Sequence, residues 1–317
     1  MRLLHARHWR QASHQKSVRG FTHGSPRRWT LAVILTLATL LAAVLAFSQP
    51  SSVHANGVGS SHSEKDYLAL GDSVPFGYNP LVANPADTDQ FIGYPTSVAQ
   101  TLGLRLTNAA CPGATSSYLV SLAGPDWACI PFRSRFPLHV NYSTSQLDFA
   151  VAFLRSHPHT RLVTLTIGAN DLFRLQSLCG GSISCVQAGL PGLLATLAAN
   201  LNTTYAAIRH TAHYHGQLVA LTYYSTNYAD PTTTAIIHAL DETLGQRTRA
   251  WGGVVASGFA AFAAASASAN GDPCAAGLLI RLSATICDVH PSVAGRILLA
   301  HTVVAMVRHN DARSVAG

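Results

Sequence analysis

Short apolar runs alternate with longer segments of helical pattern from about residue 66 onward, and this alternation constrains the fold more than any other feature. It predicts parallel strands joined by helices, because parallel neighbours need a long crossover between them. We expect strands at Tyr67–Leu70, Leu104–Thr107, Leu162–Ile167 and Leu218–Tyr223, with a fifth near Gly253–Ala256. The expected helices are Tyr94–Leu102, Gln146–Ser156, Leu190–His210, Thr232–Leu244 and Ser292–Val307.

The beginning of the chain has the layout of a secretory leader. An apolar run, Leu31–Phe47, follows two arginines and precedes a candidate cleavage site at Val53–Ala55. We therefore expect a signal peptide at 1–55, a polar linker at 56–65 and one folded domain at 66–317, outside the cytoplasm. The alternative is an uncleaved anchor, since a run of this length can span a thin bilayer. The paired arginines also fit a twin-arginine signal in part.

The net charge of +7 belongs to this leader and does not indicate a nucleic-acid partner. Residues 1–55 hold seven basic and no acidic side chains, and the rest of the chain has 14 of each sign. Binding to a phosphate backbone requires a basic surface, so we expect no nucleic acid. The apolar fraction of 48% against 11% charged residues is enough for a large core.

All six cysteines lie beyond the leader, and an even number in an exported chain predicts disulfides. Zinc is the competing interpretation, but no short paired-cysteine motif with matching histidines is present. His210, His213 and His215 end a predicted helix without carboxylate or cysteine partners, so we expect a solvated surface and no metal. Grouping by sequence favours three local pairs: Cys111–Cys129, Cys179–Cys185 and Cys274–Cys287.

Ser73 lies in the stretch DYLALGDSVPFGY, just after the first predicted strand and a Gly–Asp turn. The stretches NAACPGATS (Asn108–Ser116) and TIGANDLF (Thr166–Phe173) follow the second and third strands in the same way. A fourth stretch, CDVHPS (Cys287–Ser292), precedes the last helix. Open α/β sheets bind ligands at the carboxyl ends of their strands, so we expect these stretches to converge.

Taken together, GDSV, the loop at Gly113, GAND and DVHP resemble the four sequence blocks of the SGNH, or GDSL, hydrolase family, in the family's order. The resemblance extends from about Asp66 to His301. It implies a flavodoxin-like, three-layer αβα fold with a central parallel sheet of about five strands. It also implies a serine hydrolase that acts on ester bonds without a metal or cofactor.

The same resemblance makes Ser73 the nucleophile, His290 the general base, and Gly113 and Asn170 donors to the oxyanion. A serine hydroxyl needs an imidazole to accept its proton, so Ser73 and His290 must meet in space although they are far apart in sequence. The negative oxygen of the tetrahedral intermediate then needs preorganised donors, and the N–H of Ser73 is a third candidate. Each residue alone also fits a turn, a helix cap or a loop. We expect Asp171 to be structural.

The acid departs from the family's pattern. The family usually places an aspartate three residues before the histidine, whereas here that position is Cys287 and Asp288 stands only two residues before His290. We expect Asp288 to orient the imidazole. The alternative is a backbone carbonyl near Cys287, which would fix the same tautomer with less stabilisation of the imidazolium.

The leading functional prediction is a secreted, monomeric serine esterase or lipase that forms an acyl-enzyme with a small-molecule or lipid ester. Membrane contact is expected only through an uncleaved leader or a lipid substrate. The chain has no GxSxG motif of the ordinary α/β-hydrolase elbow. The alternatives are a carbohydrate O-acetyl esterase with the same site and an exported binding protein on the same fold. Aromatic residues in the variable segments can line an acyl pocket or belong to the core: Phe91, Trp127, Phe132 and Phe136.

Overall fold

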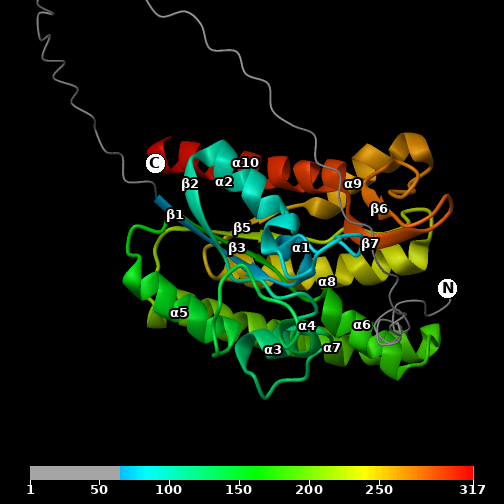
Figure 1. The fold of residues 1–317 in the computed structure, drawn as a ribbon, viewed down its shortest axis with the longest axis horizontal. Coiled ribbons are helices and arrows are strands. Elements are labelled where there is room, and N and C mark those ends of the chain that lie inside the picture. Colours follow the sequence, from blue (N-terminus) through cyan, green and yellow to red (C-terminus); the bar gives the residue numbers. More distant parts are fainter. Residues whose placement is uncertain (1–64, 317) are drawn as a thin grey trace, which may run out of the picture. The chain divides into compact units, whose positions relative to one another are not determined.

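Five parallel strands form the central sheet, in the order β2-β1-β3-β4-β5 (Figure 1). In the described residues, β3 is buried throughout, and β1 is buried at every position after Lys65. Strands of this kind read as continuous apolar runs because helices cover both faces of the sheet. The predicted parallel sheet is confirmed. Its strands are β1 (Lys65–Gly71), β2 (Leu104–Asn108), β3 (Leu162–Thr166), β4 (Gln217–Leu221) and β5 (Val254–Ala256).

The structure is a computed structural model, and it describes residues 65–316. The expected signal peptide, its cleavage site and nearly all of the linker lie outside the described residues, and the division of the chain into these parts stays a prediction.

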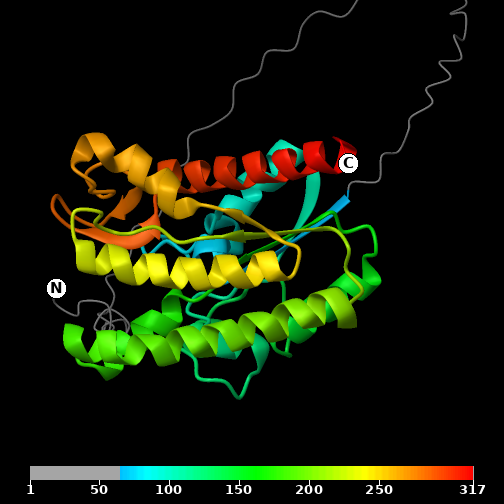
Figure 2. The same cartoon turned by 180° about the vertical axis from the view of Figure 1, so that it is seen from behind.

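Helices cover both faces of the sheet, as Figures 1 and 2 show. One layer contains α2 (Tyr94–Leu102), α9 (Gly258–Ser266) and α10 (Val293–Ala316). The other contains α5 (Gln146–Ser156), α7 (Ile183–Ala206) and α8 (Pro231–Ala250). The three-layer αβα prediction is therefore confirmed, and α2 and α5 have the predicted bounds.

Helix α7 begins at Ile183, earlier than the predicted start at Leu190. The sequence pattern did not reveal this first part because Gly189, Pro191 and Gly192, which lie inside the helix, are poor helix formers. With the turn that follows, it forms a segment, Ile183–Thr211, long and apolar enough to cross a bilayer by composition. In the fold it packs against α8 and forms part of a helical layer.

Several short elements are not predicted by periodicity, because they span too few residues to show it. Two of them form an antiparallel hairpin, β6 (Leu279–Arg281) and β7 (Cys287–Pro291), so that the CDVHPS stretch is largely a strand. The remaining helical elements are α1 (Ser73–Phe76), α3 (Ser116–Val120), α4 (Cys129–Arg133), α6 (Ala169–Leu178), η2 (Thr88–Gln90), η3 (Ala207–Thr211) and η4 (Ala267–Ala269).

Three disulfides join the cysteines in the predicted local pairs: Cys111–Cys129, Cys179–Cys185 and Cys274–Cys287. The first ties the loop after β2 to α4, and the second links the end of α6 to the start of α7. The third joins the segment before β6 to the first residue of β7.

The strand order places a topological switch point between β1 and β3. From β1 the chain crosses to β2 on one side of the sheet, and β3 then pairs with β1 on the other side. Open α/β sheets bind ligands beyond the carboxyl ends of the strands at such a point. Ser73 follows β1 and Asn170 follows β3, so two of the predicted site residues border this position.

Candidate active site

Ser73 is the first residue of α1, and hydrogen bonds hold the two residues before it, Gly71 and Asp72. The side-chain amide of Gln146 pairs with Gly71: the Gly71 N–H donates to Oε1 at 2.6 Å, and Nε2 donates to the Gly71 carbonyl at 3.0 Å. Asp72 caps α1 by accepting the Val74 N–H at 3.0 Å. The Ser73 hydroxyl is thereby fixed at the carboxyl end of β1.

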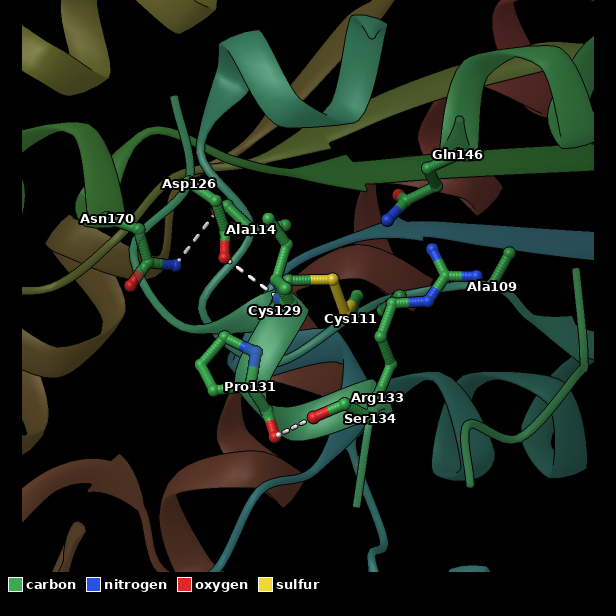
Figure 3. Close-up of a disulfide and its surroundings, with 12 residues drawn as sticks. Ala109, Cys111, Ala114, Asp126, Cys129, Pro131, Arg133, Ser134, Gln146 and Asn170 are labelled. Atoms are coloured by element: carbon green, nitrogen blue, oxygen red, sulfur yellow. Dashed lines mark hydrogen bonds between the residues drawn. A yellow bond between two sulfur atoms is a disulfide. The ribbon is translucent and has the colours of Figure 1, made fainter. Parts of the chain in front are cut away.

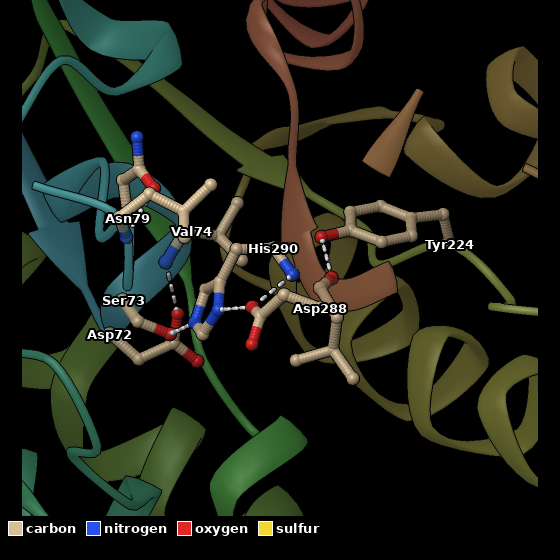
Figure 4. Close-up of polar contacts among 9 residues, drawn as sticks. Asp72, Ser73, Val74, Asn79, Tyr224, Asp288 and His290 are labelled. Carbon is tan, nitrogen blue, oxygen red and sulfur yellow. Dashed lines mark hydrogen bonds and ion pairs between the residues drawn. The ribbon is translucent and has the colours of Figure 1, made fainter. Parts of the chain in front are cut away.

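His290 lies between Ser73 and Asp288, as Figure 4 shows. Its Nε2 is 2.8 Å from Ser73 Oγ, and its Nδ1 contacts Asp288 Oδ1. A carboxylate can only accept, so Nδ1 carries the proton and Nε2 is free to accept the Ser73 O–H. The structure therefore brings together a hydroxyl from near the beginning of the domain's sequence and an imidazole and a carboxylate from near its end.

The Asp288 carboxylate reaches the His290 ring although only one residue separates them, because both lie on strand β7. Alternate residues of a strand point to the same face, so the carboxylate meets the ring without a helical turn between them. The intervening carbonyl of Val289 accepts the Tyr224 hydroxyl at 2.7 Å, which fixes the strand against the segment that follows β4 (Figure 4). The carboxylate, rather than a backbone carbonyl near Cys287, lies against Nδ1.

The ring of Tyr78 packs on the His290 ring, with their centroids 4.9 Å apart. Burial, with a smaller contribution from the Asp288 charge, raises the pKa of Tyr78 to about 12, so its hydroxyl is neutral at physiological pH. The His290 side chain is 13% exposed and the Asp288 side chain 6%. Partial exclusion of water strengthens the interactions of this pair.

The backbone N–H groups of Ser73 and Gly113 have no acceptor among residues 65–316, and the Gly113 loop is joined to the end of β1 by the Cys111 N–H, which donates to the Gly71 carbonyl at 3.0 Å. The first N–H groups of a helix have no intrahelical partner, which explains Ser73. Gly113 lies in the loop after β2, at φ +85°. An added Cβ there would lie 2.4 Å from Ala128 Cβ, so only glycine fits this loop. The loop is further held by the Cys111–Cys129 disulfide (Figure 3).

Asn170, in the first turn of α6, supplies a side-chain amide from the other side of the switch point. One N–H of Nδ2 donates to the Ala114 carbonyl at 3.0 Å (Figure 3). The other contact of Nδ2, to Asp72 Oδ2, is longer at 3.4 Å, so this second N–H is the weaker-bonded one and the one that a substrate oxygen could engage. Asp171 accepts the N–H and the hydroxyl of Ser116, as its expected structural role requires.

Asp72 and Tyr223 are site residues that the sequence reasoning did not single out. Asp72 is buried, and its carboxylate accepts hydrogen bonds from the Tyr223 hydroxyl and Asn170. Burial raises the pKa of Asp72 to about 6, although the bonds from Tyr223 and Val74 act in the opposite direction. The sequence signal was available for Tyr223, because it closely follows β4 at the same edge of the sheet.

A cavity of about 260 Å³ is lined by the residues that follow the serine and histidine in the chain, Val74 and Pro291, and not by Ser73 or His290 themselves. Residues that neighbour them in sequence line it, among them Val74, Tyr78 and Ser292. The variable segment after α1 also contributes, through Asn79, Leu81 and Gln90. By contrast, Phe91 and Phe132, left open in the sequence as pocket or core, are core residues that pack against Phe76.

The described part of the chain contains no cluster of three or more His, Cys, Asp or Glu side chains placed to hold a metal. His213 and His215 are exposed, and the ring of His210 packs edge-on against Trp251.

The fold is that of the SGNH hydrolases. The chain belongs to the GDSL-like lipase/acylhydrolase family, whose model matches residues 69–296. No curated protein matches the sequence.

Solved structures with the same fold include phospholipase A1 from Streptomyces albidoflavus NA297, at 20% identity and a TM-score of 0.52, covering 78% of this chain and 99% of that one. A lipase from a goat rumen metagenome is 16% identical with a TM-score of 0.50, and the match covers 76% of this chain and 96% of the lipase. A catalytic mutant of an acetylxylan esterase from Geobacillus stearothermophilus is 17% identical with a TM-score of 0.50, and the match covers 77% of this chain and 94% of the esterase. These likenesses describe the fold.

Proposed function

We propose that this protein is a secreted serine hydrolase that cleaves carboxylic esters through an acyl-enzyme intermediate. The observation that carries the proposal is His290, which joins Ser73 Oγ at 2.8 Å on one side and the Asp288 carboxylate on the other. A neutral imidazole held in this tautomer is the base that a serine nucleophile requires.

The proposed reaction has two steps, acylation of the serine and hydrolysis of the acyl-enzyme. Ser73 Oγ attacks the acyl carbon while His290 Nε2 takes the hydroxyl proton, and the carbonyl oxygen gains the negative charge. The N–H groups of Ser73 and Gly113 and the Asn170 amide stabilise that oxygen. The bond to the alcohol breaks as Nε2 returns the proton to the leaving oxygen. Water repeats the sequence on the acyl-enzyme and releases the acid.

The test is hydrolysis of p-nitrophenyl esters of increasing acyl length by the protein and by Ser73→Ala, with Ser121→Ala on the surface as the matched control. We expect loss of activity in Ser73→Ala alone, and labelling of Ser73 by a fluorophosphonate, read by peptide mass. Equal activity in Ser73→Ala would refute the assignment. Hydrolysis of acetylated sugars without hydrolysis of longer acyl esters would favour the carbohydrate O-acetyl esterase alternative.

The secreted location rests on the cysteines. All six described cysteines are paired in disulfides, a state typical of exported proteins. The leader that would direct export lies outside the described residues. Expression in a bacterial host followed by N-terminal sequencing of the protein from the medium tests this part, and we expect the mature chain to begin at Asn56.

A further inference from the structure

Exposed apolar side chains gather on the segments that line the cavity next to Val74 and Pro291. Six of the ten large apolar side chains exposed in residues 65–316 line it or lie on those segments, and we call this set the apolar rim. Single exposed apolar residues are ordinary, but a group at the mouth of a site marks an interaction surface. The apolar rim consists of Leu81, Ile92, Leu282, Ile286, Val293 and Ile297.

The apolar rim is built by three segments that meet at the cavity. Leu81, Ile92 and Val293 line the cavity itself, with Leu81 and Val293 each 59% exposed. Ile297 follows Val293 by four residues on α10 and so shares its face. Leu282 and Ile286 lie beside each other at the tip of the β6–β7 hairpin, where the Leu282 N–H donates to the Ile286 carbonyl at 2.9 Å.

Two arginines accompany the apolar rim without acidic partners. Arg281 and Arg296 both line the cavity, and no ion pair joins either to a carboxylate within residues 65–316. Their side chains donate to backbone carbonyls: Arg296 to Ile92, and Arg281 to Cys274 and Ala284, each at 2.9 Å. Partial burial lowers the pKa of Arg296, so a bound anion would relieve an electrostatic cost there.

No carboxylate lines this cavity. Asp87 and Asp89 belong to the same segment as Leu81 but do not line the cavity; Asp87 caps η2 and accepts the side-chain amide of Gln90 at 3.0 Å. The charge offered by the cavity wall is therefore positive, within an apolar surround. This combination matches an anionic phospholipid surface, where phosphates lie just above the acyl chains.

We propose that the apolar rim docks the protein on a membrane or micelle of anionic phospholipid, with Arg281 and Arg296 against the phosphates. Docking would place the cavity, and with it Ser73, over an ester of a lipid in that surface. This deepens the proposed function, on which it rests, by naming the class of substrate: esters of amphiphiles that carry a phosphate.

The first test measures, one position at a time, whether an exposed residue enters the lipid surface. Because the described cysteines are all paired, a new one can be labelled alone with an environment-sensitive fluorophore. Ile286→Cys and Ile297→Cys report on the apolar rim, and Leu122→Cys and Leu178→Cys, exposed elsewhere, are the matched controls. All carry Ser73→Ala in the full chain, so that vesicles stay intact and any contribution of the leader is the same throughout.

We expect vesicles of phosphatidylglycerol to raise the emission of the two rim labels, and chain-labelled nitroxide lipids to quench it, while the control labels do not respond. An equal response at the control positions, or none at the rim, overturns the proposal. All labelled variants carry Ser73→Ala, so this binding result does not depend on ester hydrolysis. Equal hydrolysis by the protein and by Ser73→Ala in the esterase assay would refute the proposed function, and it would leave the docking result unaffected.

The second test measures affinity for vesicles by co-sedimentation. We expect Ile286→Ser with Ile297→Ser to weaken binding about tenfold, as loss of buried apolar surface predicts. Arg296→Gln should reduce the preference for phosphatidylglycerol over phosphatidylcholine about fivefold, while Arg308→Gln, on the same helix, leaves it unchanged. Circular dichroism checks that each variant folds. An unchanged preference in Arg296→Gln, with normal folding, contradicts the role of the arginines.

Discussion

Asp288 Oδ1 accepts two hydrogen bonds from His290, one from the ring Nδ1–H and one from the main-chain N–H at 3.0 Å. The same oxygen therefore fixes both the tautomer of the imidazole and the backbone that carries it. A spacing of two residues achieves this because β7 is extended, so the two side chains share one face of the strand.

The first prediction concerns this carboxylate. We expect Asp288→Asn to lower kcat for p-nitrophenyl esters by about 10³- to 10⁴-fold, because an amide no longer selects the productive tautomer or stabilises the imidazolium. Asp148→Asn, on α5, is the control and should keep its activity. A loss of less than about tenfold would indicate that another group orients His290.

The second prediction concerns the oxyanion. We expect Asn170→Ala to lower kcat about 10²- to 10³-fold while KM changes little, because the amide stabilises charge that exists only in the transition state. Steady-state kinetics at several ester concentrations separates the two parameters. A rise in KM with unchanged kcat would make Asn170 a ground-state binding residue instead.

The third prediction compares two glycines with positive φ. Gly113→Ala would place a Cβ 2.4 Å from Ala128 Cβ, whereas Gly252, at φ +70°, has nothing within 4 Å of the added atom. We expect Gly252→Ala to cost about 1 kcal/mol of stability and to keep activity. Gly113→Ala should cost more and lose activity, because its loop must move. Urea denaturation and the ester assay measure both, and equal behaviour of the two variants would contradict the close fit at Gly113.

The fourth prediction concerns the disulfides. In Cys111→Ser with Cys129→Ser we expect lower stability by about 3 kcal/mol and lower kcat, because this bridge spans 18 residues and holds the Gly113 loop. The bridge of the control pair, Cys179→Ser with Cys185→Ser, spans 6 residues, and its loss should cost about 2 kcal/mol without a change in kcat. Unchanged kcat in the first pair would separate the loop from catalysis.

The fifth prediction is a pH dependence of stability. Burial raises the pKa of Asp72 to about 6 in the folded protein, against about 4 in the unfolded chain. Between these values the folded state takes up a proton that the unfolded chain does not, so acidification favours folding through this group. Relative to Asp72→Asn, the protein should gain up to about 3 kcal/mol from pH 7 to pH 4. Urea denaturation at both values measures the difference, and a constant difference would mean that Asp72 titrates normally.

The order of strands and helices was predictable because it is written in local apolar periodicity. The central strands are continuous apolar runs, and α2 and α5 repeat their apolar residues over enough turns to reveal their bounds. The short α1 and the β6–β7 hairpin were not predictable in this way, since three to five residues carry no period. The sequence order of the motifs still placed Ser73 and Asn170 at strand ends.

What the sequence by itself determined is the parallel α/β architecture, the local pairing of the cysteines and the family, because these depend on residue types and spacing along the chain. Only the tertiary structure decided that Asp288 can reach His290, that Phe91 and Phe132 belong to the core, and that Asp72 and Tyr223 share a buried network beside Asn170. These relationships join segments far apart in sequence or depend on the backbone conformation between neighbours, and neither is encoded in the composition of any one stretch.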